Sequence, residues 1–228
     1  MEAYKIKIEL LDADPAIWRE VVMPADATFK RLHDVIQNTT NFLGGYPSDG
    51  YHLYKFDLVK NNILVTNDEE AYVEHKHFMK NRKVMEKEMR EQVLPEHEKF
   101  VQRRLQSLQT VVRKPTGLKI DDYLQKYGEL LYTYDFGDDW RFLITLESIR
   151  EDYPYGYPTL LDGAGTAPPE DVGGLLGFAS FLKKYHDQKD PDHDDVVQWA
   201  EMQQYREYDK TQINSRLKGI KYKKTEWT

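Results

Sequence analysis

The sequence predicts an α+β fold: a mixed, twisted sheet with a helical-hairpin insertion and a helical C-terminal part. Two observations predict it. Apolar and polar residues alternate over residues 4–10 and again over residues 131–146, and this period of two is typical of half-buried strands. Residues 68–114, in contrast, contain no glycine and are rich in charges of both signs, as exposed helices are. Because strands and helices occupy separate stretches, the pattern favours α+β over α/β.

The composition is that of a globular protein with one hydrophobic core. Of the 228 residues, 40% are hydrophobic and 31% are charged, so we expect a single domain over residues 1–228 with an insertion at about residues 68–114. The chain has no cysteine, which excludes disulfides, thiol catalysis and cysteine-ligated zinc and favours a reducing, cytoplasmic location.

Hydropathy and charge also limit the partners. No apolar run approaches the length of a membrane span, and residues 1–10 lack the apolar region of a signal peptide, so we expect no membrane partner. The formal net charge of -7 disfavours nucleic acid, because binding to phosphates depends on Lys and Arg. The sequence identifies no other partner.

The first 65 residues predict a ββαββ unit. Residues 4–10 and 17–23 form the first pair of strands, and Thr28 is a good N-cap for the helix that follows. After a glycine-rich loop, residues 51–59 and 63–65 predict a second hairpin, joined through two asparagines.

Residues 68–114 predict two helices folded back on each other and separated at Pro95. In the second helix, a single narrow apolar stripe is formed by Val101, Leu105, Leu108 and Val112. We expect this stripe to pack within the chain, and the alternative is a homodimer formed through the 68–114 helices.

The centre of the chain predicts a hairpin with a tight turn. The turn lies between Phe136 and Trp140, and we expect Gly137 to supply the positive φ that it requires. Before it, a short helix over residues 120–127 ends at Gly128.

The rest of the chain predicts a long irregular loop and then helices. The loop covers residues 154–169, and the helices cover residues 175–186, about 190–199 and 211–217, before a lysine-rich tail.

Carboxylates gather at the central turn. Asp135, Asp138 and Asp139 lie beside Trp140, and His33 or His52, brought near by the sheet, would complete an oxygen-and-imidazole metal site. The structural alternative, which we favour, is that these aspartates bond turn amides and pair with Arg19 or Arg141. We expect His33 on its own to be a histidine at the edge of the core.

A second polar stretch precedes the helix at residue 175. Its sequence, Pro-Pro-Glu-Asp-Val-Gly-Gly at residues 168–174, suggests a phosphate cradle because two glycines precede a helix N-terminus. The charges of Glu170 and Asp171 would repel a phosphate, so we expect these two side chains to cap the helix instead.

Five segments together resemble a known family. In order, they are Pro-Ala-Ile-Trp-Arg at 15–19, Leu-His at 32–33, His-Leu-Tyr-Lys-Phe at 52–56, Tyr-Asp-Phe-Gly-Asp-Asp-Trp at 134–140, and the Pro-Pro stretch at 168–174. This set resembles the plasmid pRiA4b ORF-3-like family and covers nearly the whole chain except the 68–114 helices. The resemblance implies an α+β fold and no established activity.

The chain differs from the usual family pattern in two places. It also lacks a catalytic motif of the resolvases, an enzyme class by which some members are labelled. Asn41-Phe42-Leu43-Gly44 stands where the family usually has Gly-Trp, and the insertion is longer than usual. Some members carry the label of a transposon-associated resolvase. In this sequence no histidine has an arginine three residues on, as tyrosine recombinases require.

Three functions follow as hypotheses. The first is a binding or adaptor module with an acidic, aromatic-lined cleft; the alternative is a metal-dependent, hydrolase-type enzyme; the third is a role in DNA transactions of mobile elements. We assign no catalytic residue, metal or cofactor. The candidate cleft residues are Trp18, Arg19, His33, His52, Asp135, Asp138, Asp139, Trp140, Glu170 and Asp171.

Overall fold

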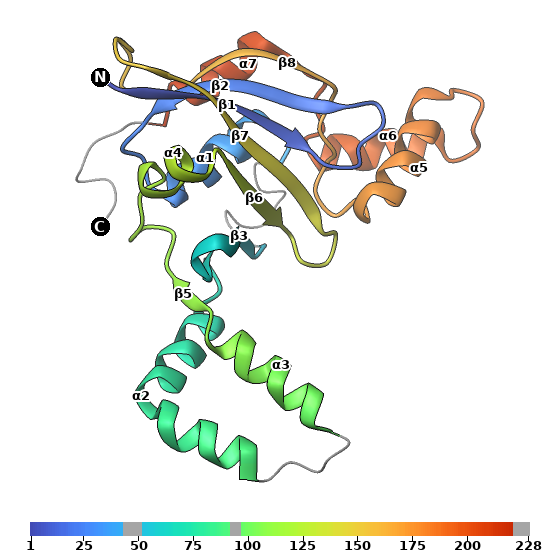
Figure 1. The fold of residues 1–228 in the computed structure, drawn as a ribbon. Coiled ribbons are helices and arrows are strands. Elements are labelled where there is room, and N and C mark those ends of the chain that lie inside the picture. The colour runs from blue at the N-terminus through green and yellow to red at the C-terminus, as the bar shows by residue number, and fades with distance from the viewer. Residues whose placement is uncertain (43–51, 92–96, 221–228) are drawn as a thin grey trace.

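The computed structural model describes residues 1–42, 52–91 and 97–220, and its strands form one eight-stranded sheet (Figure 1). The strand order is β5-β4-β3-β6-β7-β1-β2-β8. The strands are β1 Ala3–Leu10, β2 Ile17–Pro24, β3 Tyr54–Leu58, β4 Ile63–Thr66, β5 Val111–Arg113, β6 Glu129–Tyr134, β7 Trp140–Arg150 and β8 Thr159–Ala164. Neighbouring strands are antiparallel except β4 and β5, which are parallel, so the predicted mixed sheet of an α+β fold is confirmed.

The core lies between one face of this sheet and the helices. The helices are α1 Phe29–Thr39, α2 Glu69–Glu91, α3 Glu98–Leu108, α4 Asp121–Tyr127, α5 Gly174–His186, α6 His193–Met202 and α7 Lys210–Leu217. Side chains of α1, α4, α5 and α7 share one buried apolar cluster with the strands. In Figure 1, α5 and α6 lie together beyond the end of the sheet at which β1 turns into β2.

Local sequence explains the first elements. The alternation in β1 buries Tyr4, Ile6 and Ile8, while Lys5, on the other face, pairs with carboxylates of neighbouring strands. Thr28 caps α1 as predicted, since its side chain accepts a hydrogen bond from the Arg31 backbone N–H.

The insertion differs from the prediction at its end. Helix α3 stops at Leu108, and residues 111–113 form β5, which pairs with β4 through Ile63 and Val111. Val112, predicted to continue the helical stripe, therefore lies on a strand. The physical reason is that Val111 and Val112 are β-branched and find an open edge of the sheet.

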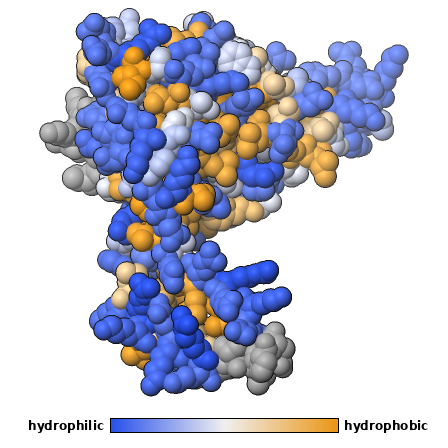
Figure 2. Space-filling model, viewed as in Figure 1, coloured by the Kyte–Doolittle hydropathy of each residue, from blue (hydrophilic) through white to orange (hydrophobic). Residues whose placement is uncertain are grey.

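Helices α2 and α3 project away from the sheet as a pair (Figure 1). Figure 2 shows this pair as mainly hydrophilic outside, with apolar atoms between the two helices. Leu105 and Leu108 of the predicted stripe are buried there, as is Phe78 of α2. The break predicted at Pro95 lies outside the described residues, as does most of the glycine-rich loop that begins at Asn41.

A strand occupies part of the stretch predicted as an irregular loop. Thr159–Ala164 forms β8, the edge strand that pairs with β2 from Thr159 opposite Val22 to Ala164 opposite Trp18. The strand was not predicted because the stretch contains Gly163 and Gly165, and glycine has a low propensity for β-strands. A side chain at Gly163 would meet the Trp18 carbonyl oxygen at 2.8 Å, so this glycine allows the close approach of the two strands.

The central hairpin forms with a different turn. Tyr134 pairs with Trp140, so the loop covers residues 135–139, and the positive φ angles belong to Asp135 (52°) and Asp139 (54°) rather than to Gly137. The prediction for Gly137 was wrong because aspartate also tolerates the left-handed region. Gly137 donates its backbone N–H to Asp135 Oδ1 at 2.9 Å.

The C-terminal helices α5, α6 and α7 occur where helices were predicted. Most of the lysine-rich tail, residues 221–228, lies outside the described residues. Within the part of the chain that is described, no helix has the length and hydropathy needed to cross a bilayer.

Candidate metal centre

Strand pairing brings the first two site residues together. Tyr54 at the start of β3 pairs with Tyr134 at the end of β6, so residues just before β3 lie beside residues just after β6. The Asp135 backbone N–H donates to the Leu53 carbonyl at 2.9 Å, which continues the pairing by one step. His52 and Asp135, 83 positions apart in sequence, are neighbours for this reason.

The turn before α5 supplies the third part of the site. The Tyr134 hydroxyl donates to Glu170 Oε1 at 2.7 Å, and the Gly173 backbone N–H donates to Asp138 Oδ2 at 3.1 Å. Gly174 packs so closely on the hairpin that a Cβ there would lie 2.9 Å from the Asp138 carbonyl oxygen. These contacts fix Glu170 and the following Asp171 above the end of β6.

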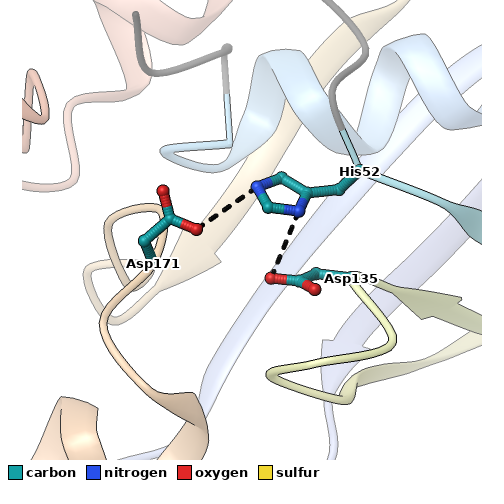
Figure 3. A group of neighbouring side chains, drawn as sticks. All are labelled: His52, Asp135 and Asp171. Atoms are coloured by element: carbon teal, nitrogen blue, oxygen red, sulfur yellow. Dashed lines mark ion pairs between the residues drawn. The ribbon is translucent and has the colours of Figure 1, made fainter.

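The imidazole of His52 lies between carboxylates (Figure 3). His52 Nδ1 is 3.5 Å from Asp135 Oδ2, and His52 Nε2 is 3.4 Å from Asp171 Oδ1. Glu170 Oε2 is 3.7 Å from the same Nε2. One ligand atom from each of His52, Asp135 and Asp171 lies within 4.8 Å of the others.

Burial is graded across the cluster. The side chain of Glu170 is 3% exposed, that of Asp135 12%, that of His52 16% and that of Asp171 61%. The cluster therefore extends from the core of the protein to its surface.

Glu170 is the unusual member. Its Oε2 is buried and has no hydrogen-bond partner. Burial raises the pKa of Glu170 to about 7, although the hydrogen bond from Tyr134 and the charge of His52 act in the opposite direction. Burial also raises the pKa of Tyr134, and the neighbouring Glu170 adds to this. A buried carboxylate oxygen without a partner is costly unless a cation compensates it.

The arrangement has the features of a cation site. A metal-bound histidine generally donates its second ring N–H to a carboxylate, and Asp135 is placed to orient His52 in this way. Ligand atoms at roughly 2.1 Å from a tetrahedral ion are roughly 3.4 Å apart. Two separations, 3.4 Å from His52 Nε2 to Asp171 and 3.7 Å from the same nitrogen to Glu170, are close to that value. Among the described residues, the group whose ligand atoms all lie within 4.8 Å of one another is His52, Asp135 and Asp171.

Asp138 and Asp139 have structural roles in the described chain. Asp138 Oδ2 accepts from Gly173, the N-cap residue of α5, and Asp139 lies 3.5 Å from Arg141 Nε at the surface. The expectation that Glu170 and Asp171 cap α5 was therefore wrong, because the N-cap residue of α5 is Gly173, whose own N–H donates to an aspartate of the hairpin.

His33 and Trp140 are core residues. His33 Nδ1 is 2.8 Å from the Tyr132 hydroxyl, and its ring stacks on Tyr54 with centroids 3.7 Å apart. Burial, and then the charge of Lys30, lower the pKa of His33 well below 6.5. Trp140 is 1% exposed and packs against Phe42 with centroids 5.8 Å apart.

Trp18 and Arg19 lie on β2, where their observed contacts do not include the His52 cluster. Arg19 Nε donates to the Thr39 carbonyl at 2.9 Å, and its terminal nitrogens donate to the carbonyls of Trp18, Ala164 and Gly165. Trp18 receives the ammonium of Lys7 over its ring at 5.8 Å. Arg19 therefore joins α1 to the edge strand β8.

Sequence reasoning missed Tyr134, the residue that holds Glu170. One signal was available: a tyrosine that points into the core needs a partner for its hydroxyl, and Tyr134 immediately precedes Asp135.

The similarity to other proteins extends over most of the chain. The pattern of the family described as plasmid pRiA4b ORF-3-like protein matches residues 2–216. The chain belongs to this family. Of the five segments by which the sequence resembles the family, those at 52–56, 134–140 and 168–174 meet at the His52 cluster, whereas the segment at 15–19 lies on β2 and the turn before it.

Two relatives of this pRiA4b ORF-3-like protein are described as uncharacterized or of unknown function, and one of them has a solved structure with a similar fold. The uncharacterized protein y4hQ of Sinorhizobium fredii is 25% identical over 201 residues, which is 88% of this chain and 82% of that protein. The crystal structure of MM3350, a protein of unknown function from Methanosarcina mazei Go1, matches with a TM-score of 0.60 and 25% identity, over 87% of this chain and 89% of that one.

Proposed function

We propose that this pRiA4b ORF-3-like protein is a binding module whose ligand is a divalent metal cation, held by His52, Glu170 and Asp171. One observation carries the proposal: Glu170 Oε2 is buried without a hydrogen-bond partner and lies 3.7 Å from His52 Nε2. Natural proteins rarely leave a buried carboxylate oxygen unsatisfied, and an ion between these two atoms would satisfy it.

Asp135 orients the histidine in this proposal. With the Nδ1 proton directed at Asp135, the lone pair of His52 Nε2 faces Glu170 and Asp171, which are the two other ligands. One imidazole and two carboxylates suit zinc, manganese or ferrous iron, whereas calcium takes six to eight oxygen ligands.

A metal-dependent enzyme of hydrolase type is the second candidate. It is favoured by the number of protein ligands, since three protein ligands leave a coordination position for water, as in catalytic zinc sites. Asp171 is 61% exposed, so in this proposal that position would face solvent.

Native mass spectrometry tests the binding proposal. The protein is stripped with a chelator and then offered zinc, manganese or ferrous iron. We expect one bound ion per chain, lost in His52→Ala and in Glu170→Gln and retained in Asp139→Asn, a matched acidic control outside the cluster. Absence of binding for all three metals, or retention of the ion in both cluster variants, would contradict the proposal.

We further propose that the α2–α3 pair provides a contact to a second copy of this chain. Exposed apolar side chains on these helices support it: Val73 is 62% exposed, Val84 60% and Phe100 71%. Large apolar side chains so exposed on one element are common at protein interfaces.

A further inference from the structure

A second polar cluster lies around a small cavity at the C-terminal end of α1. The cavity is bounded by the end of α1, by the segment 206–209 and by α7. Arg19, Arg206 and Arg216 all line it, together with Tyr208.

The three arginines bring an excess of positive charge into a confined space. Burial lowers the pKa of Arg19 to about 10, and the charge of Arg216 acts in the same direction. Burial likewise lowers the pKa of Arg216, and the charge of Arg206 adds to this. All three guanidinium groups belong to residues that line the same cavity, so their charges repel one another.

The carboxylates near the cavity offset this charge only in part, since the charge of Asp209 acts on Arg216 against the effect of burial. Asp209 also lines it, but Asp209 Oδ1 accepts the N–H groups of Thr211 and Gln212 at the start of α7. Glu207 lines the cavity with an exposed side chain. Within the described part of the chain, no carboxylate forms an ion pair with any of the three arginines.

Several hydrogen-bond donors at the cavity have no acceptor. Arg206 Nε and Nη2 are buried without a hydrogen-bond partner, and so is the hydroxyl of Tyr208. The two nitrogens form one edge of the guanidinium, a fork that holds an anion between two parallel N–H groups. Asn41 fixes the backbone beside this fork, since Asn41 Nδ2 donates to the Arg206 carbonyl at 3.0 Å.

The size of the cavity limits the ligand. Its volume is about 10 Å³, enough for one particle of roughly the size of a water molecule. A phosphate or carboxylate group does not fit. A water molecule fits and accepts hydrogen bonds, but it leaves the buried positive charges uncompensated.

We propose that this cavity is a binding site for one monatomic anion, chloride under ordinary conditions, held by the Arg206 Nε and Nη2 fork and the Tyr208 hydroxyl. The bound anion joins α1, the segment 206–209 and α7 and stabilises the packing of α7 on the sheet. This site is independent of the metal proposed at His52.

Bromide diffraction and thermal unfolding test the anion site in chelator-treated protein, so that no metal contributes. We expect an anomalous bromide peak beside Arg206 Nε in crystals grown in bromide. We also expect the melting temperature to rise saturably as chloride replaces gluconate at constant ionic strength.

Variants separate the site from general salt effects. Arg206→Gln should weaken the apparent chloride affinity at least tenfold, and Tyr208→Phe, a gentler change, should weaken it several-fold. Arg103→Gln, an exposed arginine of α3, should behave like the wild type. Overturning results are a cavity that holds only water in bromide crystals, or equal chloride effects in the wild type and both cavity variants.

Discussion

Glu170 is the residue at which binding and stability oppose each other. In the metal-free protein its charge is buried and one oxygen has no hydrogen-bond partner. A cation would offset this cost, so the proposed ligand and the local instability have the same origin.

Glu170→Gln should therefore stabilise the metal-free protein while abolishing metal binding. The amide keeps an oxygen for the Tyr134 hydroxyl and carries no charge. We expect the free energy of unfolding at about pH 8, measured with urea in the presence of a chelator, to increase by about 1–2 kcal/mol. A variant less stable than the wild type would show that the carboxylate has a structural role.

His33 should make the stability depend on pH. Its pKa is well below 6.5 in the folded protein because the ring is buried among Tyr54, Tyr132 and Tyr134, with Lys30 adding to the effect. The unfolded chain therefore binds a proton below pH 6.5 that the folded protein does not. The contribution of His33 to stability is complete above pH 6.5 and is lost as the pH decreases below it, by at most about 1.4 kcal/mol per pH unit.

Urea unfolding from about pH 7.5 to about pH 5 measures this dependence. His33→Gln keeps a polar group near the Tyr132 hydroxyl. In this variant, the slope of the free energy of unfolding against pH should decrease by up to the equivalent of one bound proton. His186→Gln removes an exposed histidine at the end of α5 and should leave the slope unchanged. Equal slopes in the wild type and His33→Gln would rule out this origin of the pH dependence.

At the scale of the elements, the contact between the β6–β7 turn and the start of α5 positions the site. Gly174 has φ 67°, and a Cβ there would lie 2.9 Å from the Asp138 carbonyl oxygen. Any side chain would both strain the backbone and move the turn that carries Glu170 and Asp171.

Gly174→Ala should destabilise the protein by about 2 kcal/mol and weaken metal binding. Gly156→Ala is the matched control, because nothing lies within 4 Å of its Cβ position. Thermal unfolding and metal titration of both variants measure the two effects. If Gly174→Ala bound metal with the affinity of the wild type, this result would show that the turn does not position the ligands.

The elements also show how far sequence patterns predict this fold. The ββαββ unit, the central hairpin and the C-terminal helices follow from alternation, apolar stripes and caps, which are local. β5 and β8 do not, because each is a short edge strand whose pairing partner is distant in sequence: β5 pairs with β4 across the α2–α3 insertion, and β8 pairs with β2.

The candidate site could be predicted only in part for the same reason. Asp135 and His52 could be named from their residue types and their places beside strands. The packing of a distant turn on the hairpin brings Asp171 and Glu170 to them and directs Asp138 to the start of α5 instead. This packing could not be predicted from local sequence. The absence of a hydrogen-bond partner for Glu170 Oε2 results from how the core packs, so it could not be predicted from the sequence.

At the scale of the whole molecule, the α2–α3 pair should govern the oligomeric state. We expect light scattering after size-exclusion chromatography to give a dimer for the wild type and a monomer for Phe100→Ser, since Phe100 is 71% exposed on α3. Leu176→Ser, at an 88% exposed position on α5, is the control and should remain dimeric. A monomeric wild type would contradict the proposed contact.

The site and the α2–α3 pair belong to different parts of the molecule. The ligands lie just before β3 and in the turn before α5, whereas α2 and α3 project beyond the β4–β5 edge of the sheet (Figure 1). Metal binding should therefore be the same in the wild type and in Phe100→Ser.

Anomalous diffraction from crystals grown with zinc is the decisive test for a cation between His52, Glu170 and Asp171. We expect a zinc peak at roughly 2.0–2.2 Å from His52 Nε2, Glu170 Oε2 and Asp171 Oδ1, with Asp135 facing His52 Nδ1. Zinc bound elsewhere while these side chains stay unoccupied would contradict it.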